Sequence, residues 1–307
     1  SMVALGTHSL QDSIMLREFA SKTWRDAYLE PLVAGEIFPS FAMTEPDISS
    51  SDPTQLQTTA VLEGDEWVIR GRKWFTTGAA SAAYTTVMCK TELDVPSHGA
   101  FSMIIVPTDN PGYKIVRETP VLGTTGGSGH YEVEYDNVRV PAENLLGPRG
   151  QGFLIAQRRL GPGRIHHCMR TIGKAEVALE LMVKRAGTRE AFGKPIAKLG
   201  GNLEIISRAR IEINAMRLSV LQAAKAMDVL GNKEARVYVS AIKAMVPEKA
   251  CLIIDQAIQM HGAAGISQWT PLAGLYTDIR HLRFADGPDE VHHMVVGRAE
   301  LQKYDLW

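Results

Sequence analysis

The sequence predicts an α+β protein in which a strand-rich region precedes a helical region. Between about Phe38 and Leu146, short apolar runs are separated by clusters of Gly, Pro, Ser and Asp, a pattern typical of strands and turns. Beyond Gly152, apolar residues recur with the 3.6-residue period of an amphipathic helix. Because the strands come before the helices and do not alternate with them, the pattern favours separate domains over a doubly wound sheet.

Length and charge narrow the class of protein further. A chain of 307 residues predicts about two domains at roughly 150 residues per domain. The 33 basic and 34 acidic side chains nearly cancel, which argues against nucleic acid or an anionic membrane surface as a partner. No apolar run approaches the ~18 residues that a membrane-spanning helix needs. The composition therefore predicts a globular protein without a membrane span.

The cysteines and the N-terminus indicate the cellular setting. Cys89, Cys168 and Cys251 are too far apart for a CxxC site or a disulfide framework, and they suit a reducing compartment. The first residues show no signal peptide, and Ser1-Met2 resembles the remnant of a cleaved tag.

The elements follow in order along the chain. Apolar residues at near-helical spacing predict a helix from about Ser9 to Leu32, which ends before Gly35. Tyr131–Asp136 alternates with period two and predicts a strand with one buried and one wet face. Further strands are predicted at Glu66–Phe75, Tyr84–Lys90 and Phe101–Val106.

The helical region contains about four long helices up to Lys303. A helical stripe predicts one helix that ends at Gly231-Asn232, and Glu234–His261 predicts the next. The stripe consists of Ile206, Ala209, Ile213, Met216, Val220, Leu221 and Ala224.

Some apparent motifs do not fit the chemistry they suggest. The glycines of 123–129 have the wrong spacing for GxGxxG, and a strand follows where that motif needs a helix, so we expect a turn. Adjacent histidines at 166–167 and 292–293 would point about 100° apart on a helix, so we predict no metal site. No GxSxG turn supports a serine nucleophile.

Two stretches of the strand region carry possible chemistry. Phe41–Asp52 runs from a strand into a hydroxyl-rich loop whose N–H and hydroxyl groups suit a pyrophosphate, although a plain Ser-rich loop is an equal alternative. Trp74–Gly78 places an aromatic side chain and hydroxyls at one strand end, and core packing of Trp74 is the alternative there.

Two further stretches lie in the helical region. Arg189–Pro195 links two helices. Gln259–Gly265 is followed by Arg283–Glu290, in which a carboxylate precedes a glycine just before a helix. From the local sequence alone, Asp286 is more simply explained as the N-cap of that helix.

Together, and in this order, the four stretches resemble the acyl-CoA dehydrogenase family from about Tyr28 to Tyr304. The sequences of Arg159–Arg170 and Ala285–His292 are most similar to the branch that contains members 10 and 11 and their bacterial relatives. The resemblance implies a middle β-barrel or sandwich domain (38–147) followed by a C-terminal four-helix bundle (148–307). Residues 1–37 would be the remnant of a truncated N-terminal helical domain, and the upstream kinase-like domain of members 10 and 11 is not part of the sequence.

The resemblance also implies an activity. Such an enzyme uses FAD to oxidise an acyl-CoA to the 2,3-enoyl-CoA, as in the β-oxidation of fatty acids, while a base removes the α-proton and hydride goes to flavin N5. The residues matching flavin contacts within one subunit are Phe41, Met43, Thr44, Ser51, Trp74 and Thr76; those matching contacts to the neighbour's FAD are Arg189, Phe192, Gln259, Gly262 and Ala263. Ser51, Gly161 to Arg164 and Gly287 would face the acyl-CoA.

The same resemblance implies partners and a location. Sharing of FAD between subunits implies a homodimer or homotetramer, with an electron-transferring flavoprotein as electron acceptor. A bacterial protein would be cytoplasmic, and a eukaryotic one mitochondrial or peroxisomal.

The base is implied by position. Most family members place a Glu directly before the Gly of the fourth stretch, where this chain has Asp286. Others place the carboxylate where this chain has Gly163, which cannot take a proton, so Asp286 is the remaining candidate. Aspartate is one methylene shorter, and a misplacement of ~1 Å can cost about 10²-fold in rate, so the loop or the substrate must compensate.

Two alternatives remain open. A flavin oxidase of the same fold, similar to nitroalkane oxidase, also uses an Asp base and would consume oxygen. A catalytically silent, truncated scaffold would expose apolar surface and hold flavin weakly or not at all, which a visible spectrum would reveal.

Overall fold

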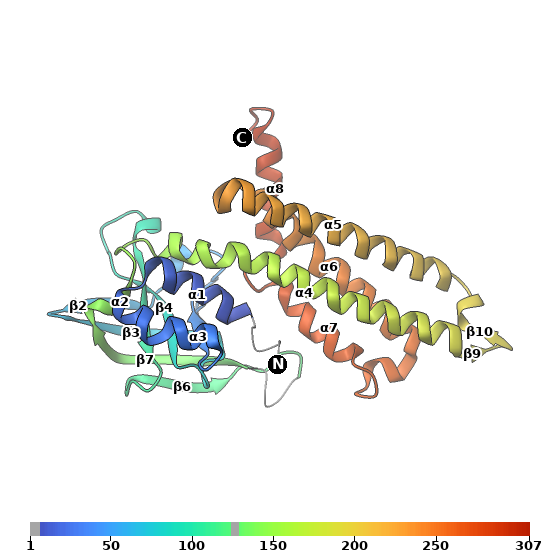
Figure 1. Cartoon of the computed structure of the whole chain (residues 1–307), viewed down its shortest axis with the longest axis horizontal. Helices are drawn as coiled ribbons and strands as arrows, with labels where there is room; N and C mark the ends of the chain where they lie inside the picture. Colours follow the sequence, from blue (N-terminus) through green and yellow to red (C-terminus); the bar gives the residue numbers. More distant parts are fainter. Residues whose placement is uncertain (1–6, 124–128) are drawn as a thin grey trace. The chain divides into compact units, whose positions relative to one another are not determined.

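The computed structural model describes residues 7–123 and 129–307, and it divides the chain into two compact units, Ser1–Leu160 and Gly161–Trp307. Figure 1 labels their helices and strands. Each unit has its own hydrophobic core and is described by itself.

Unit 1 begins with short helical segments, not with one continuous helix. The predicted helix is interrupted near Ser21, whose hydroxyl accepts a hydrogen bond from the N–H of Trp24 at 3.4 Å. Gly35 adopts φ 77° and ends the last segment, as the sequence predicts. The segments are α1 (Thr7–Phe19), α2 (Lys22–Trp24), the π-helical turn η2 (Arg25–Leu29) and α3 (Glu30–Ala34).

An eight-stranded mixed sheet forms the rest of unit 1, in the order β6-β7-β3-β2-β4-β5-β8, with β1 pairing parallel to β4. The predicted strands are confirmed with small changes at their ends. The strands are β1 (Pro39–Ala42), β2 (Thr59–Glu63), β3 (Glu66–Thr77), β4 (Tyr84–Lys90), β5 (Phe101–Pro107), β6 (Tyr113–Glu118), β7 (His130–Pro141) and β8 (Leu145–Leu146). Three short 3₁₀ turns, η3 (Pro53–Gln55), η4 (Ser97–Gly99) and η5 (Ala142–Asn144), lie among the described connections.

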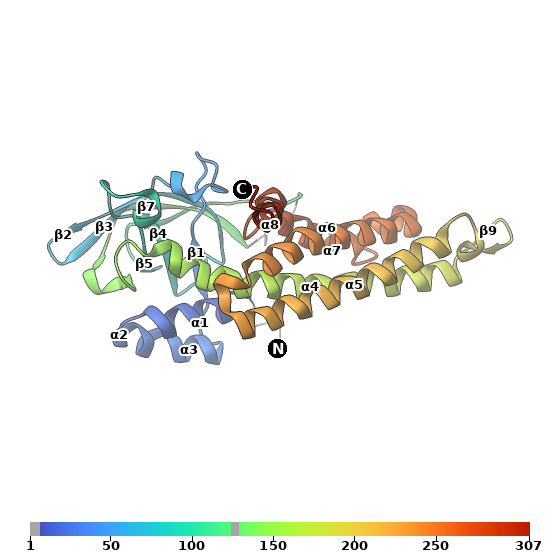
Figure 2. The same cartoon turned by 90° about the horizontal axis from the view of Figure 1, so that it is seen from above.

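The two-residue period of the central strands divides the core of unit 1 between the two faces of the sheet. On β4, Tyr84 and Met88 belong to a cluster with Met15 and Leu16 of α1, whereas Val87 and Cys89 join a cluster on the opposite face. Figure 2 shows α1 to α3 covering the first of these faces. Because both faces of β4 are covered, its residues from Tyr84 to Cys89 are all buried.

One expectation for β7 is wrong in detail. Val133 and Tyr135 are buried as predicted, but Glu132, expected on the wet face, is completely buried. Two arginines explain this burial: Arg117 Nε lies 2.7 Å from Glu132 Oε2, and Arg72 pairs with the other carboxylate oxygen. A buried carboxylate is tolerated because both of its oxygens have cationic partners.

Unit 2 is a helical bundle. The long helix α4 (Gly152–Thr188) begins in unit 1 and continues in unit 2, and a small hairpin of β9 (Glu190–Ala191) and β10 (Lys194–Pro195) follows it. The other helices are α5 (Asn202–Glu234), α6 (Arg236–His261), α7 (Leu272–Arg280) and α8 (Asp289–Gln302), with 3₁₀ turns η6 (Ile196–Lys198), η7 (Gly262–Ile266) and η8 (His281–Arg283).

The core of the bundle comes from four of these helices. Ile172 on α4, Ile213 on α5, Ile254 on α6 and Leu272 on α7 belong to one buried cluster. Gly231, with φ 80°, produces a kink at the predicted end of α5. Among the described residues, no helix is long and apolar enough to cross a membrane. Residues 124–128 of the predicted glycine-rich turn lie outside the described residues, and β7 follows at His130 as expected.

Candidate functional site

The fold brings the first two predicted stretches together in unit 1. Thr44 follows β1 and Trp74 lies on β3, and they exchange two hydrogen bonds: Thr44 Oγ1 donates to the Trp74 carbonyl at 2.6 Å, and the Trp74 N–H donates to the Thr44 carbonyl at 3.0 Å. Trp74 is only half-buried, so core packing alone does not account for it. The hydroxyl-rich loop therefore starts beside the aromatic strand end.

A buried ion pair that the sequence analysis missed fixes this junction. Lys73 Nζ lies 2.8 Å from Glu45 Oε1 and also donates to the Met43 carbonyl at 2.8 Å. Backbone N–H groups of Gln57 and Thr58 donate to the same carboxylate. Although burial acts to raise it, Lys73 and these donors lower the pKa of Glu45 below its ordinary value. The local sequence gave no clear signal for this pair, because Arg70 and Arg72 on the same strand are exposed.

The backbone is irregular where the aromatic residues project. The register between β3 and β7 shifts between Lys73 and Thr76, and Phe75 in this bulge has φ 49°. Phe75 is exposed, whereas Thr76 is buried, and the Thr76 hydroxyl has no hydrogen-bond partner among the described atoms. Strained backbone and an unpartnered polar atom are common at ligand sites.

Two further predicted residues of unit 1, Phe41 and Ser51, lie on β1 and in the loop that follows it. Phe41, on β1, is half-buried beneath the Arg159 guanidinium, whose carbon is 4.2 Å from the ring centroid. Ser51 is exposed, and its hydroxyl is 2.9 Å from that of Ser49.

In unit 2, Asp286 occupies a left-handed backbone conformation with φ 57°. The N-cap of α8 is Pro288, and the helix begins at Asp289, so the simpler interpretation of Asp286 as the N-cap is wrong. A non-glycine residue at positive φ needs support from its surroundings, and such residues often occur at functional sites.

Donors from three helices hold the main chain of this loop. Arg164 Nε on α4 and His292 Nε2 on α8 both lie within hydrogen-bond distance of the Asp286 carbonyl, at 2.9 and 3.2 Å. On α6, the fully buried Lys243 donates to the carbonyls of Leu282 and Gly287, the latter at 3.2 Å. Two of these three donors, Arg164 and Lys243, are distant from the loop in the sequence.

Burial shapes the charges of these donors. Desolvation, together with the nearby cations Arg164 and Lys243, lowers the pKa of His292 to about 3, so its ring is neutral. Because a carbonyl can only accept, Nε2 of His292 carries the proton, and Nδ1 faces the Ser240 hydroxyl at 3.3 Å. Burial also lowers the pKa of Lys243, against the attraction of Asp286.

The Asp286 carboxylate faces a side chain of α4. Its Oδ2 lies 3.1 Å from His167 Nε2, and the two side chains are 16 % and 13 % exposed. A partly desolvated carboxylate on a rigid loop has the properties of a general base.

The predicted glycines of unit 2 sit at close approaches. Gly287 has φ 107°, and a Cβ there would lie 2.9 Å from His292 Nε2. A Cβ on Gly161 would lie 2.1 Å from the Asn232 side-chain oxygen. A larger residue at either position would displace its neighbour.

The other predicted residues of unit 2 surround an open hollow of about 490 Å³. Arg189, Gln259, Gly262 and Ala263 all line it, so the fold unites the third stretch with the first half of the fourth. Arg185 also lines it, and its buried Nε has no hydrogen-bond partner among the described atoms. Two arginines beside such a hollow suit an anionic ligand.

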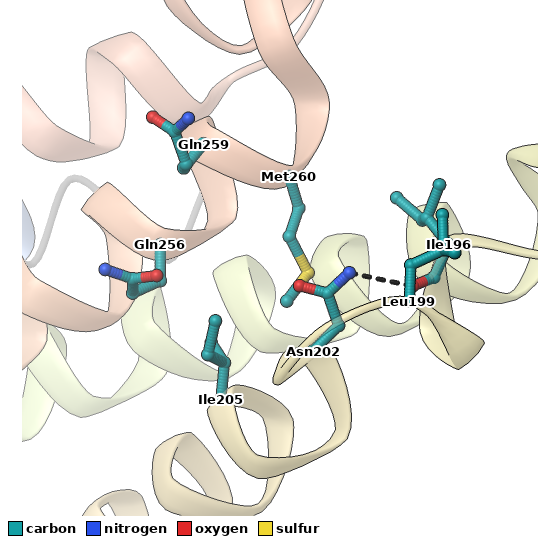
Figure 3. A pocket seen from close by; sticks show the side chains of 7 residues that line it. All are labelled: Ile196, Leu199, Asn202, Ile205, Gln256, Gln259 and Met260. Atoms are coloured by element: carbon teal, nitrogen blue, oxygen red, sulfur yellow. Dashed lines mark hydrogen bonds between the residues drawn. The ribbon is translucent and has the colours of Figure 1, made fainter. Parts of the chain in front are cut away.

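Phe192 does not line the hollow. It stands at the tip of the β9–β10 hairpin, 94 % exposed and with φ 51°. A second hollow, of about 280 Å³, shares Ile196, Gln259 and Met260 with the first (Figure 3). There, Asn202 Nδ2 donates to the Ile196 carbonyl at 2.7 Å.

Comparison with known proteins gives a consistent answer. The acyl-CoA dehydrogenase middle domain matches residues 40–138, and the acyl-CoA dehydrogenase C-terminal domain matches residues 150–301. FadE2 of Mycobacterium tuberculosis, described as a probable acyl-CoA dehydrogenase, is 51 % identical over 94 % of this chain and 72 % of its own length.

Two further relatives extend the comparison. Rat acyl-CoA dehydrogenase family member 11 is 44 % identical over 94 % of this chain, which spans only 38 % of that relative. The structure of an acyl-CoA dehydrogenase homologue from Mycobacterium abscessus superposes with a TM-score of 0.94 at 47 % identity, covering 96 % of this chain and 74 % of the other. The chain therefore belongs to the acyl-CoA dehydrogenase family of oxidoreductases.

Proposed function

We propose that this chain carries out the FAD-dependent α,β-dehydrogenation of an acyl-CoA thioester to the 2,3-enoyl-CoA, with Asp286 as the base. The observation that carries the proposal is the Asp286 loop, whose main chain is held by hydrogen bonds from Arg164, His292 and Lys243 and whose carboxylate is mostly buried. Bound FAD would supply the acceptor for the β-hydrogen, which leaves as hydride to flavin N5.

The residues present fit such a cofactor. The 490 Å³ hollow has Arg189 on its wall and an Arg185 Nε without a hydrogen-bond partner among the described atoms, so it offers cationic donors to a diphosphate. Gly262, with φ 63°, leaves the main chain open beside it. With Gln259, Ala263 and the nearby Phe192, these residues would serve the FAD of a neighbouring subunit, which makes a homodimer or homotetramer part of the proposal.

Residues 38–147 would bind the flavin of their own subunit. One segment, β1 and the loop after it, contains Phe41, Met43, Thr44 and Ser51. Trp74 and Thr76 lie on β3, which is hydrogen-bonded to this segment. The buried Thr76 hydroxyl, which has no protein partner among the described atoms, fits a polar ligand atom. Lys73 and Glu45 would hold this segment in place without touching the cofactor.

Asp286 would take the α-proton from the thioester. Ser51, Gly161, Arg164 and Gly287 would contact the acyl-CoA, and Gly287 brings a stretch of main chain without a side chain next to the base. An electron-transferring flavoprotein would reoxidise the enzyme, as expected for β-oxidation in a bacterial cytoplasm, a mitochondrion or a peroxisome.

The proposal is tested with the purified chain, FAD and a panel of straight and branched acyl-CoAs. We expect bound flavin in the visible spectrum, bleaching by at least one acyl-CoA, and a product two hydrogens lighter by mass spectrometry. Asp286→Asn should keep flavin and fold but lower the bleaching rate by about 10²–10⁴-fold, the usual share of a general base. Asp278→Asn, which removes an exposed carboxylate from α7, is the matched control.

Three results would count against the proposal. Bleaching of Asp286→Asn at the parental rate would remove Asp286 from the chemistry. Peroxide release in air during turnover would indicate a flavin oxidase. A chain that binds no flavin at any FAD concentration would indicate a silent scaffold.

A further inference from the structure

Helix α5 carries apolar side chains on two opposite sides. One side is buried in the core of the bundle and includes Ile213, Met216 and Val220. On the other side, five aliphatic side chains are 60 to 69 % exposed: Leu203, Ile211, Leu218, Leu221 and Val229. At 3.6 residues per turn, these five fall within an arc of about 80° that faces away from the core. Figure 1 shows α5 at the edge of the bundle.

The exposed aliphatic residues belong to a continuous strip along the helix. At the same spacing of three or four residues, the positions between them are Ser207, Asn214 and Lys225, so only one of the eight positions is charged. We call these eight residues the α5 seam: Leu203, Ser207, Ile211, Asn214, Leu218, Leu221, Lys225 and Val229. A helix with apolar residues on both sides is typical of one that is covered on both sides.

The α5 seam is complementary to a second copy of itself. Its midpoint falls at position 216, and each seam position has a counterpart at the same distance beyond that midpoint. In an antiparallel pair of α5 helices, Leu203 of one copy would therefore meet Val229 of the second copy. Ile211 would meet Leu221 in the same way. Such a contact uses the same surface on both copies, as two-fold symmetric dimers do, and three- and four-residue spacing suits helices packed side by side.

The place of the seam in unit 2 also favours a second copy. Leu203 lies between Asn202 and Ile205 in the sequence, and both of these line the smaller hollow (Figure 3). That hollow shares residues with the 490 Å³ hollow, where the proposed function puts the FAD of a neighbouring subunit. A copy seated along the seam would therefore reach the site that requires a neighbour.

The size of the seam fits the centre of an interface. Its 26-residue span is about 40 Å long, and at a helix diameter of about 10–12 Å it covers roughly 400–500 Å² on each copy. A standard interface buries roughly 800 Å² per partner, with a polar rim around an apolar centre. Arg210 and Arg217, which lie beside the seam and pair with Glu176 of α4, would belong to that rim.

We propose that the α5 seam is an interface between two copies of this chain, paired antiparallel about a two-fold axis near position 216. The inference rests on the proposed function for what the second copy does at the cofactor site. The contact itself depends only on the exposed side chains of the seam.

Charged substitutions test both the surface and its register. Leu218→Glu places an acidic group near the axis in both copies, so we expect the dissociation constant of the pair to rise by about 100-fold or more. Ile211→Glu and Leu221→Lys should each weaken association as well. The double variant Ile211→Glu/Leu221→Lys should associate more tightly than either single variant, because its two new charges are opposite in sign and face each other across the seam.

Sedimentation velocity over a range of protein concentrations measures the association, and circular dichroism measures the helix content. All variants should keep their helix content, since glutamate and lysine are good helix formers at exposed positions. Leu252→Glu is the matched control: Leu252 lies on α6, outside the seam, and is 56 % exposed. It should leave association unchanged.

The outcomes separate this inference from the proposed function. The inference is wrong if the parent stays monomeric, if Leu218→Glu associates as tightly as the parent, or if the double variant is no tighter than the single ones. Loss of helix content in the single variants would also overturn it, because the seam would then pack within its own chain. In each of these cases, flavin binding and bleaching by acyl-CoA still decide the function. If Leu218→Glu separates the copies but the parent binds no flavin, the interface stands and the function fails.

Discussion

Both units bury a lysine side chain, but only the lysine of unit 1 pairs with a carboxylate at hydrogen-bond distance. In unit 1 the partners are side chains: Lys73 meets Glu45, and Arg159 Nε lies 3.2 Å from Asp12 Oδ2. In unit 2 the buried Lys243 donates to main-chain carbonyls of the Asp286 loop. The difference teaches that an ion pair between side chains locks a framework, whereas donors to carbonyls shape the main chain of a loop.

The largest expected effect is a pair of opposite pH dependences. The pKa of His292 falls from 6.5 to about 3 on folding. Between these pH values, His292 is protonated in the unfolded chain but not in the folded one. Unit 2 should therefore lose stability as the pH falls from 6.5 towards 3, by up to about 5 kcal/mol at 1.36 kcal/mol for each pKa unit.

Asp12 should act in the other direction in unit 1. Desolvation by burial raises its pKa from 3.8 to about 6 in spite of Arg159, so the folded chain binds the proton more tightly between these values. Unit 1 should lose up to about 3 kcal/mol as the pH rises from 4 to 6. Amide exchange of β4 and α6 at several pH values measures both slopes. Asp12→Asn and His292→Asn should each flatten one slope, and slopes of the same sign would contradict the comparison.

Breaking the side-chain pair in unit 1 should be the next largest effect. Glu45→Gln keeps the shape but leaves the Lys73 ammonium buried without a carboxylate, which costs about 3–5 kcal/mol. Urea unfolding followed through unit 1 amides measures the loss. The double variant Glu45→Gln/Lys73→Met should recover much of it, and a loss equal in the single and double variants would argue against the pair.

Removing the buried lysine of unit 2 should cost less. Lys243→Met leaves no carboxylate stranded, but it deprives the Leu282 and Gly287 carbonyls of a donor, at about 1–3 kcal/mol. The same urea measurement on unit 2 amides tests this. A cost above that of Glu45→Gln would mean that Lys243 pairs with Asp286 more strongly than with the main chain.

The smallest expected effect is the difference in stability cost between alanine substitutions at two glycines with positive φ. Gly64, in the turn between β2 and β3, has φ 64° and open space where the methyl group of an alanine would lie, whereas at Gly287 a Cβ would meet His292. Gly64→Ala should cost about 1 kcal/mol of left-handed strain, and Gly287→Ala about 1 kcal/mol more because φ 107° is less accessible to alanine. Thermal unfolding of the two variants gives the difference, and equal costs would show that neither φ 107° nor the His292 contact adds strain at Gly287.

Much of the fold could be predicted because it depends on local patterns. The strand at Tyr84–Lys90, the glycine that ends α3 and the kink at Gly231 all follow from side-chain period and turn chemistry, which act over a few residues. Burial of Glu132 could not be predicted, because it depends on arginines from two other strands.

The sequence by itself determined the order of the elements, the membership of the family and the position of Asp286. Only the tertiary structure decided what surrounds these residues: Thr44 beside Trp74, Lys73 beneath Met43, and His167 next to a carboxylate that local sequence assigned to a helix cap. The physical reason is the distance along the chain over which each interaction acts. Helix, strand and turn preferences are fixed by neighbours in the chain, but the partner of a buried charge is chosen by whichever distant segment packing brings within about 3 Å.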